Sequence, residues 1–74
     1  MQQYGNERGA SGVVAYELHD DAIDIKFANG DIYRYDATTP GAADVELMKR
    51  FARAGRGLTS YISKYVRDRY AEKL

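Results

Sequence analysis

A chain of 74 residues forms at most one small domain, which leaves little room for a deep catalytic cleft. It contains no cysteine, and no apolar run approaches the roughly 20 residues of a membrane span, so disulfide frameworks, thiolate metal sites and membrane helices are excluded. The segment Met1 to Tyr4 has neither the basic start nor the apolar stretch of a signal peptide. We therefore expect a soluble, cytoplasmic protein with no membrane partner.

The formal net charge of zero hides a division along the chain. Residues 1–46 carry three basic and nine acidic side chains, a net charge of −6, whereas residues 47–74 carry eight basic and two acidic ones, a net charge of +6. Such asymmetry is typical of a domain with a polyanion-binding end. It is equally typical of an acidic sheet and basic helices that neutralise one another, and the sequence leaves both interpretations open.

In chain order, residues 1–10 are polar, show no regular hydrophobic period and predict a flexible N-terminal arm. Alternating apolar residues then predict a strand from Val13 to Leu18, with Val14, Tyr16 and Leu18 on one face. After a polar turn, a second strand is expected from Ile23 to Phe27. Asn29-Gly30 turns the chain back into a third strand, Asp31 to Asp36.

The length of this turn decides where the tyrosines of the third strand point. A two-residue loop would place Arg34 and Asp36 on the apolar face, which is costly. A three-residue loop, with Gly30 left-handed in a bulge, gathers the apolar residues except Ile32 on one face. The hydrophobic pattern favours this second register, which puts Tyr33 and Tyr35 in the core. The predicted pairs are Ile25 with Tyr33, Ile23 with Tyr35, and Asp24 with Arg34, and the reverse face carries Asp24, Lys26, Ile32 and Arg34.

A first helix is expected after the strands, with Thr39 as N-cap and Pro40 at its first position, or with Asp44 as the cap of a shorter version. Gly55 and Gly57 are expected to end it. Its apolar stripe is Leu47, Met48, Phe51 and Ala54.

A second helix is expected next, ending near Arg67 or Asp68, because its continuation would rotate Arg69 into the apolar stripe. The tail from Tyr70 to Leu74 is expected to be irregular. The apolar stripe of this helix is Leu58, Tyr61, Ile62, Tyr65 and Val66. The fold class is therefore α+β: a three-stranded antiparallel β-meander followed by two helices packed on one face of the sheet, in a single domain of residues 11–74.

The central run Phe27-Ala28-Asn29-Gly30-Asp31-Ile32-Tyr33-Arg34-Tyr35 has the pattern Phe-x-Asn-Gly-x-x-Tyr-x-Tyr. This pattern resembles the centre of the KTSC domain, a family named for the C-terminal extension of some lysyl-tRNA synthetases. The resemblance covers nearly the whole chain apart from the arm, and this chain is similar to the stand-alone form found in bacteria and phages. It departs from the family pattern at Ser63, Asp68 and Ala71. The residues that carry the family motif are Phe27, Asn29, Gly30, Tyr33, Tyr35, Tyr61, Val66 and Tyr70. Through the synthetase context of the family, the resemblance suggests RNA as a ligand. Together with the lack of catalytic motifs, it leads us to expect a small non-enzymatic binding module.

Binding of RNA or another single-stranded nucleic acid is the leading functional hypothesis. Basic side chains neutralise phosphates, and tyrosine rings stack on unpaired bases. Tyr61 and Tyr65 lie on the apolar side of their helix, so we expect core packing for both instead of stacking. The candidate phosphate-binding residues are Arg53, Arg56, Lys64, Arg67 and Arg69.

The alternative hypothesis is a module for protein–protein interaction or self-association. The open face of the sheet, or the edge of the first or third strand, would then bind a partner, and exposed Ile32 favours this interpretation. Without a specific association signal, a monomer is expected.

Catalysis is the least favoured class, and we expect neither a metal nor a cofactor. His19 is the single histidine, and it lies in an acidic turn with no second ligand cluster. Ser60 and Ser63 have no nearby base in the sequence. The segment Gly55-Arg56-Gly57 lacks the context of a phosphate-binding loop and is better explained as a helix end.

Overall fold

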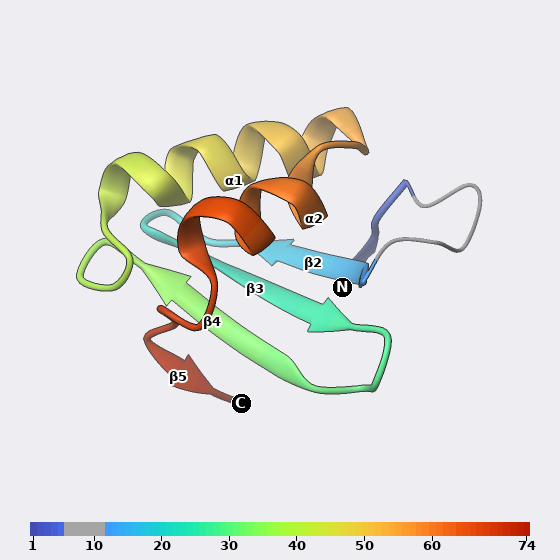
Figure 1. Cartoon of the computed structure of the whole chain (residues 1–74), viewed down its shortest axis with the longest axis horizontal. Coiled ribbons are helices and arrows are strands. Elements are labelled where there is room, and N and C mark those ends of the chain that lie inside the picture. The colour runs from blue at the N-terminus through green and yellow to red at the C-terminus, as the bar shows by residue number, and fades with distance from the viewer. Residues whose placement is uncertain (6–11) are drawn as a thin grey trace.

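The computed structural model describes residues 1–5 and 12–74 and shows one sheet with helices on one of its faces (Figure 1). The antiparallel strands lie in the order β1-β2-β3-β4-β5, with helix α1 and a shorter second helix between β4 and β5. The α+β class is as expected, but the described sheet has five strands in place of three. The strands are β1 (Gln2–Gln3), β2 (Val13–Leu18), β3 (Ala22–Phe27), β4 (Ile32–Asp36) and β5 (Glu72–Lys73).

The central hairpin has the predicted register. Gly30 has a φ of 95°, which makes it the left-handed residue of a three-residue loop. Because of this loop, Tyr33 and Tyr35 of β4 share the face of the apolar residues of β3, and Tyr35 is only 1% exposed. The paired residues are Ile25 with Tyr33, Ile23 with Tyr35, and Asp24 with Arg34.

The two outer strands correct the expectation for both ends of the chain. Gln2–Gln3 pair with β2, and the next residue, Tyr4, is buried at 4% exposure, so these residues do not form a loose arm. The rest of the expected arm, residues 6–10, lies outside the described residues. At the other end, Glu72–Lys73 pair with β4 where an irregular tail was expected. Both strands use backbone groups of an edge that would otherwise be open.

A β-bulge in β2 changes which valine enters the core. The register of β2 against β3 shifts between Val13 and Ala15, so Val14 is the extra residue. Val13 is consequently fully buried together with Tyr16, whereas simple alternation had placed Val14 on that face. The main-chain oxygen of Val14 accepts a hydrogen bond from the Tyr4 N–H at 3.0 Å, which holds the N-terminal segment on the sheet.

Helix α1 (Ala42–Ala54) begins later than predicted and turns a different face to the sheet. Its N-cap is Gly41, and neither Thr39 nor Asp44 caps it with a side chain. The reason is local: the carboxylate of Asp36 accepts hydrogen bonds from the N–H groups of Thr38 and Thr39, each at 2.9 Å, so a turn precedes the helix. The helix ends at left-handed Gly55, as predicted. Its buried residues are Val45, Met48, Lys49 and Ala52, whereas Leu47 and Ala54 of the predicted stripe are exposed.

The second helix consists of α2 (Leu58–Tyr61) and a π-helical turn, η1 (Ile62–Val66), that continues it directly. Gly57 precedes it with a φ of 87°, and a Cβ there would lie 2.9 Å from the ring of Phe51, so only glycine fits. Leu58, Ile62 and Val66 are buried as predicted, but Tyr65 is 63% exposed, which corrects its placement in the core. Because η1 contains an i→i+5 hydrogen bond, it rotates less per residue than an α-helix, and this displaces Tyr65 from the stripe.

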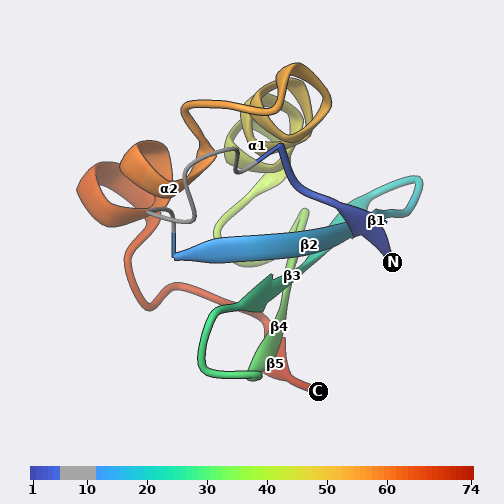
Figure 2. The ribbon, with the colours of Figure 1, turned by 90° about the vertical axis from the view of Figure 1, so that its right-hand side faces the viewer.

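Both helices lie on the same side of the sheet, and no helix of the described chain covers the other side (Figure 2). The core between the two layers is built from apolar residues of β2, β3, β4, α1 and the second helix. Its fully buried side chains are Val13, Ile23, Ile25, Tyr35, Val45, Met48, Leu58 and Val66.

Candidate nucleic-acid interface

The five predicted phosphate-binding residues are all exposed on the helical side of the molecule, but they differ in whether an acidic group neutralises them. Arg69 donates a hydrogen bond to Asp44 at 3.0 Å and is therefore already paired. None of the other four forms an ion pair with an acidic residue of the described chain. These four lie at the end of α1, in the following loop, in η1 and directly after it: Arg53, Arg56, Lys64 and Arg67.

Asp44 connects the two helices through a small polar cluster. It accepts hydrogen bonds from the Tyr61 hydroxyl and from the guanidinium of Arg69. Burial raises the pKa of Tyr61 to about 12, and the hydrogen bond to Asp44 adds to this effect. The ring of Tyr61 packs between those of Phe51 and Tyr65, with centroid separations of 5.3 and 5.2 Å. Tyr61 therefore has the structural role that its helical position predicted.

The uncovered side of the sheet carries its own charge network, centred on a buried aspartate. Asp24 is 4% exposed, and its carboxylate accepts two hydrogen bonds from Arg34, at 2.7 and 2.9 Å. His19 Nε2 lies 2.9 Å from the same carboxylate, so this histidine is bonded where a solvated turn was expected. Burial alone would raise the pKa of Asp24, but the hydrogen bonds from Arg34 and His19 outweigh it and lower that pKa below its ordinary value.

These placements divide the charges of the folded chain between two sides. Residues 42–71, which form the helices and the segment after them, contain seven basic and three acidic side chains, a net charge of +4. Asp24 and its partner Arg34 lie on the opposite face of the sheet. Asp24 thus neutralises Arg34 within the sheet, and five exposed helical cations form no ion pair with a described acidic residue: Arg50 and the four predicted residues named above. Within the described residues, no ion pair joins a carboxylate of the sheet to a cation of the helices, so the expected neutralisation of the helices by the sheet is not observed, and polyanion binding stays a prediction.

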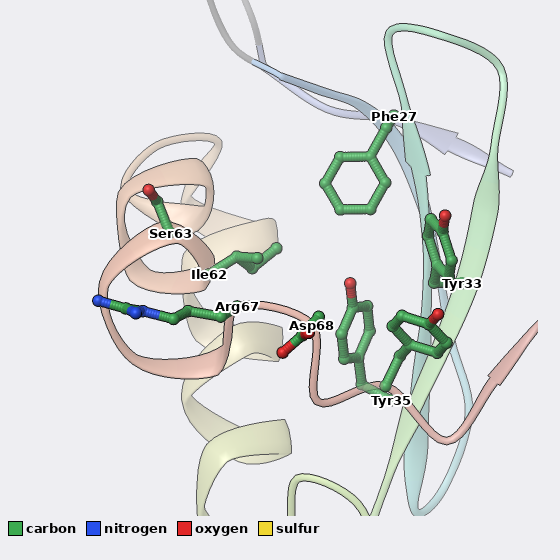
Figure 3. Close-up of a pocket in the computed structure, with 8 residues that line it drawn as sticks. Phe27, Tyr33, Tyr35, Ile62, Ser63, Arg67 and Asp68 are labelled. Carbon is green, nitrogen blue, oxygen red and sulfur yellow. The ribbon is translucent and has the colours of Figure 1, made fainter.

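An open pocket of about 440 Å³ lies between β4 and the second helix (Figure 3). Its walls contain four aromatic residues of the family motif, Phe27, Tyr33, Tyr35 and Tyr70. In Figure 3 the rings of Phe27 and Tyr33 lie on the sheet side, opposite the side chain of Ile62. The remaining lining residues are Ser63, Arg67 and Asp68, and the side chains of Ser63 and Arg67 point away from the rings.

The aromatic rings of the pocket contact one another at steep angles. Tyr70 lies 4.4 Å from Tyr33 at 42° and 6.5 Å from Tyr35 at 90°, measured between ring centroids and planes. Phe27 lies 5.7 Å from Tyr33 at 67°. Tyr33 and Tyr35 therefore both complete the core, as predicted, and form one wall of a pocket, which the sequence did not reveal.

The hydroxyl of Tyr35 has no protein partner within the described chain, although the residue is only 1% exposed. Every fully buried polar side-chain atom of the described residues is hydrogen-bonded, so this hydroxyl must reach solvent, and the pocket provides the opening. Burial raises the pKa of Tyr35 to about 12, with further contributions from Tyr33 and Tyr70. The tyrosine is consequently a neutral hydrogen-bonding group at physiological pH.

The turn after η1 places a non-glycine residue in a strained conformation at the pocket. The Arg69 N–H donates to the Val66 oxygen at 3.0 Å, which closes a four-residue turn. Within it Arg67 has a φ of 55° and a ψ of −121°, the geometry of the first central residue of a type II′ turn, which favours glycine. Such strain costs about 1–3 kcal/mol and often occurs at functional sites.

The sequence predicted the cations but missed the pocket and its unbonded hydroxyl. One signal was present, since two of the departures from the family pattern, Ser63 and Asp68, line this pocket. Within the described residues, no group of three or more His, Cys, Asp or Glu could hold a metal ion. No helix in the same part of the chain is long and apolar enough to span a bilayer.

Comparisons with protein-family models, with curated proteins and with solved structures found no match for this chain. The resemblance to the KTSC domain therefore remains a prediction from the motif residues.

Proposed function

We propose that this protein is a small, non-enzymatic module that binds single-stranded nucleic acid, with RNA as the preferred ligand. The observation that carries the proposal is the set of four exposed cations without acidic partners in the described chain, Arg53, Arg56, Lys64 and Arg67. The KTSC resemblance supports the same ligand class. We further propose that the protein acts as a monomer in the cytoplasm.

Phosphate contacts make binding strongly salt-dependent, because each neutralised phosphate releases condensed counterions. If all four cations contact phosphates, log K should fall with log salt at a slope of about −3 for a single strand. A fluorescence anisotropy titration of labelled single-stranded and structured RNA across a salt series measures this slope. No binding at low salt, or a flat salt dependence, would contradict the proposal.

Charge variants assign the effect to the named residues. The triple variant R53Q/R56Q/K64Q should leave one contact and reduce the slope to about −0.7. Lys26 is the matched control, because it belongs to β3 on the uncovered face of the sheet, and K26Q should leave the slope unchanged. The variant R69Q should have a smaller effect than any of the four, since Asp44 already neutralises Arg69. If K26Q reduces the salt slope as much as the variants of the four cations do, the RNA does not bind specifically at these four residues.

The alternative, a protein-interaction module, has less support from the geometry. β1 and β5 pair with the outer sides of β2 and β4, the two edges that were expected to be open. Ile32, the residue that favoured this alternative, is half-buried, and its oxygen accepts a hydrogen bond from the Leu74 N–H at 2.8 Å.

A further inference from the structure

We propose that the pocket between β4 and the second helix receives one unpaired base of the bound strand, and that the Tyr35 hydroxyl hydrogen-bonds to the edge of that base. This inference rests on the proposed function, since the cations would hold the strand and the pocket would hold one of its bases. Its volume of about 440 Å³ lies within the range of small-ligand pockets, about 300–1,000 Å³.

The shape and lining of the pocket favour a flat, apolar-faced occupant. Tyr70 is 38% exposed and borders the pocket together with Phe27 and Tyr33, so aromatic ring surface is available to a ligand. Bases stack on such rings irrespective of their sequence, because every base has a π-face. The side chain of Ile62 completes the apolar lining from the helical side (Figure 3).

The Tyr35 hydroxyl at the pocket suits a partner that can both donate and accept. A tyrosine hydroxyl does both, and that of Tyr35 is bonded to no described residue although the side chain is 99% buried. The edges of nucleobases carry donors and acceptors side by side, which suits this group. Because this hydroxyl reaches solvent through the pocket, it is available to a ligand that enters there.

The charged residues that line the pocket also favour an uncharged ligand. The lining contains one cation, Arg67, and one anion, Asp68, and Asp68 forms no ion pair within the described residues. A phosphate would be repelled by Asp68, whereas an uncharged base is not. The side chain of Arg67 points away from the rings (Figure 3). In the proposed complex, Arg67 would contact a phosphate of the same strand outside the pocket.

The test uses the full chain and a labelled oligonucleotide of about ten nucleotides, as RNA and as DNA, with a matched abasic version of each. Tyr35→Phe removes only the hydroxyl and should weaken binding of the base-containing strand about 2- to 12-fold. Tyr70→Leu should weaken it about 5-fold or more by removing a stacking surface. Tyr65→Leu is the matched control, because Tyr65 is exposed but does not line the pocket. Thermal melts identify any variant that fails to fold.

The abasic strand separates this inference from the proposed function. Y35F and the wild type should bind the abasic strand equally, since no base can contact the hydroxyl. If the wild type binds both strands with a steep salt slope and Y35F and Y70L bind as the wild type does, the base pocket is refuted and the proposed function stands. If Y35F loses the same affinity for the abasic strand as for the base-containing strand, the base contact is also refuted. If no strand binds at low salt, both proposals fail.

Discussion

The hydrogen bond between Tyr4 and the start of the second helix should make the N-terminal segment essential for stability. The Tyr4 hydroxyl accepts a hydrogen bond from the Leu58 N–H at 3.0 Å, and both side chains are buried, at 4% and 0% exposure. Leu58 is the first residue of α2, whose N-cap provides no side-chain acceptor, so this hydroxyl satisfies an N–H that the helix itself cannot. The variant Tyr4→Phe keeps the ring and its edge contact with Tyr16 but leaves the N–H unbonded.

An unbonded buried N–H costs about 1–3 kcal/mol. A chain of this length is typically stable by only about 4–11 kcal/mol, so Y4F should lose a large share of its unfolding free energy. The melting temperature should fall by about 4–8 °C for each kcal/mol. Urea and thermal unfolding followed by circular dichroism measure both quantities.

Tyr65→Phe is the matched control for this prediction. It removes a hydroxyl that bonds to no described residue from a side chain that is 63% exposed, and it should change stability by less than about 0.5 kcal/mol. If Y4F and Y65F unfold at the same urea concentration as the wild type, the buried N–H has another partner and the reasoning is wrong.

Two further predictions concern charge and strain. Because the pKa of Asp24 is lowered in the folded state, its contribution to the free energy of unfolding is present above its ordinary pKa of about 3.8 and is lost as the pH falls through the folded pKa. Asp24→Asn should therefore lower stability at pH 7 by about 1–3 kcal/mol and flatten the decline of melting temperature between pH 5 and 2. Curves of melting temperature against pH that run parallel for variant and wild type would contradict the Asp24–Arg34 pairing. Arg67→Gly should raise stability by about 1 kcal/mol because glycine adopts the positive φ without strain, whereas Arg67→Ala should not. Both variants should reduce the salt slope of RNA binding by about 0.7, because both remove one cation. If the two variants are equally stable, no strain is stored at this residue.

The central hairpin was predictable because several local signals agree. The alternation of Ile23 and Ile25 with charged residues leaves one register that keeps charged side chains off the apolar face, and Gly30 provides the left-handed position that this register needs. The opposite charges of Asp24 and Arg34 then fall on directly paired positions. A one-residue slip would violate all three conditions at once.

The buried faces of the two helices were less predictable, because a lysine lies on the buried face of α1 and a π-helical turn interrupts the regular period of the second helix. Lys49 lies outside the predicted apolar stripe, yet it is 5% exposed, and its Nζ donates to the Asp20 oxygen at 2.8 Å and lies 3.4 Å from Glu46. A lysine that is buried along its stem and bonded at its tip fits an apolar face, and periodicity alone does not reveal this. Likewise, the π-helical turn that exposes Tyr65 has no signature in the hydrophobic pattern.

The pocket escaped prediction because the C-terminal segment, which was expected to be irregular, forms part of its wall. Tyr70 reaches Tyr33 because the following residues pair with β4: the Ala71 N–H donates to the Arg34 oxygen at 2.7 Å, and β5 continues the pairing. Strands of two polar residues carry no alternation, so their pairing depends on an edge that exists only after the central sheet has formed.

In this small domain, contacts that stabilise the fold also position the walls of the pocket that we propose binds a base. Tyr4 holds the start of the second helix, and Ile62 and Arg67, which lie further along it, border the pocket on the helical side. Tyr70 and β5 hold the opposite wall against β4. The two walls differ in how they are held: Tyr35 and Ile62 belong to the hydrophobic core, whereas Tyr70 is held by ring contacts and by the short pairing of β5 with β4. Loss of the β5 pairing should therefore affect the proposed base binding more than the stability of the core.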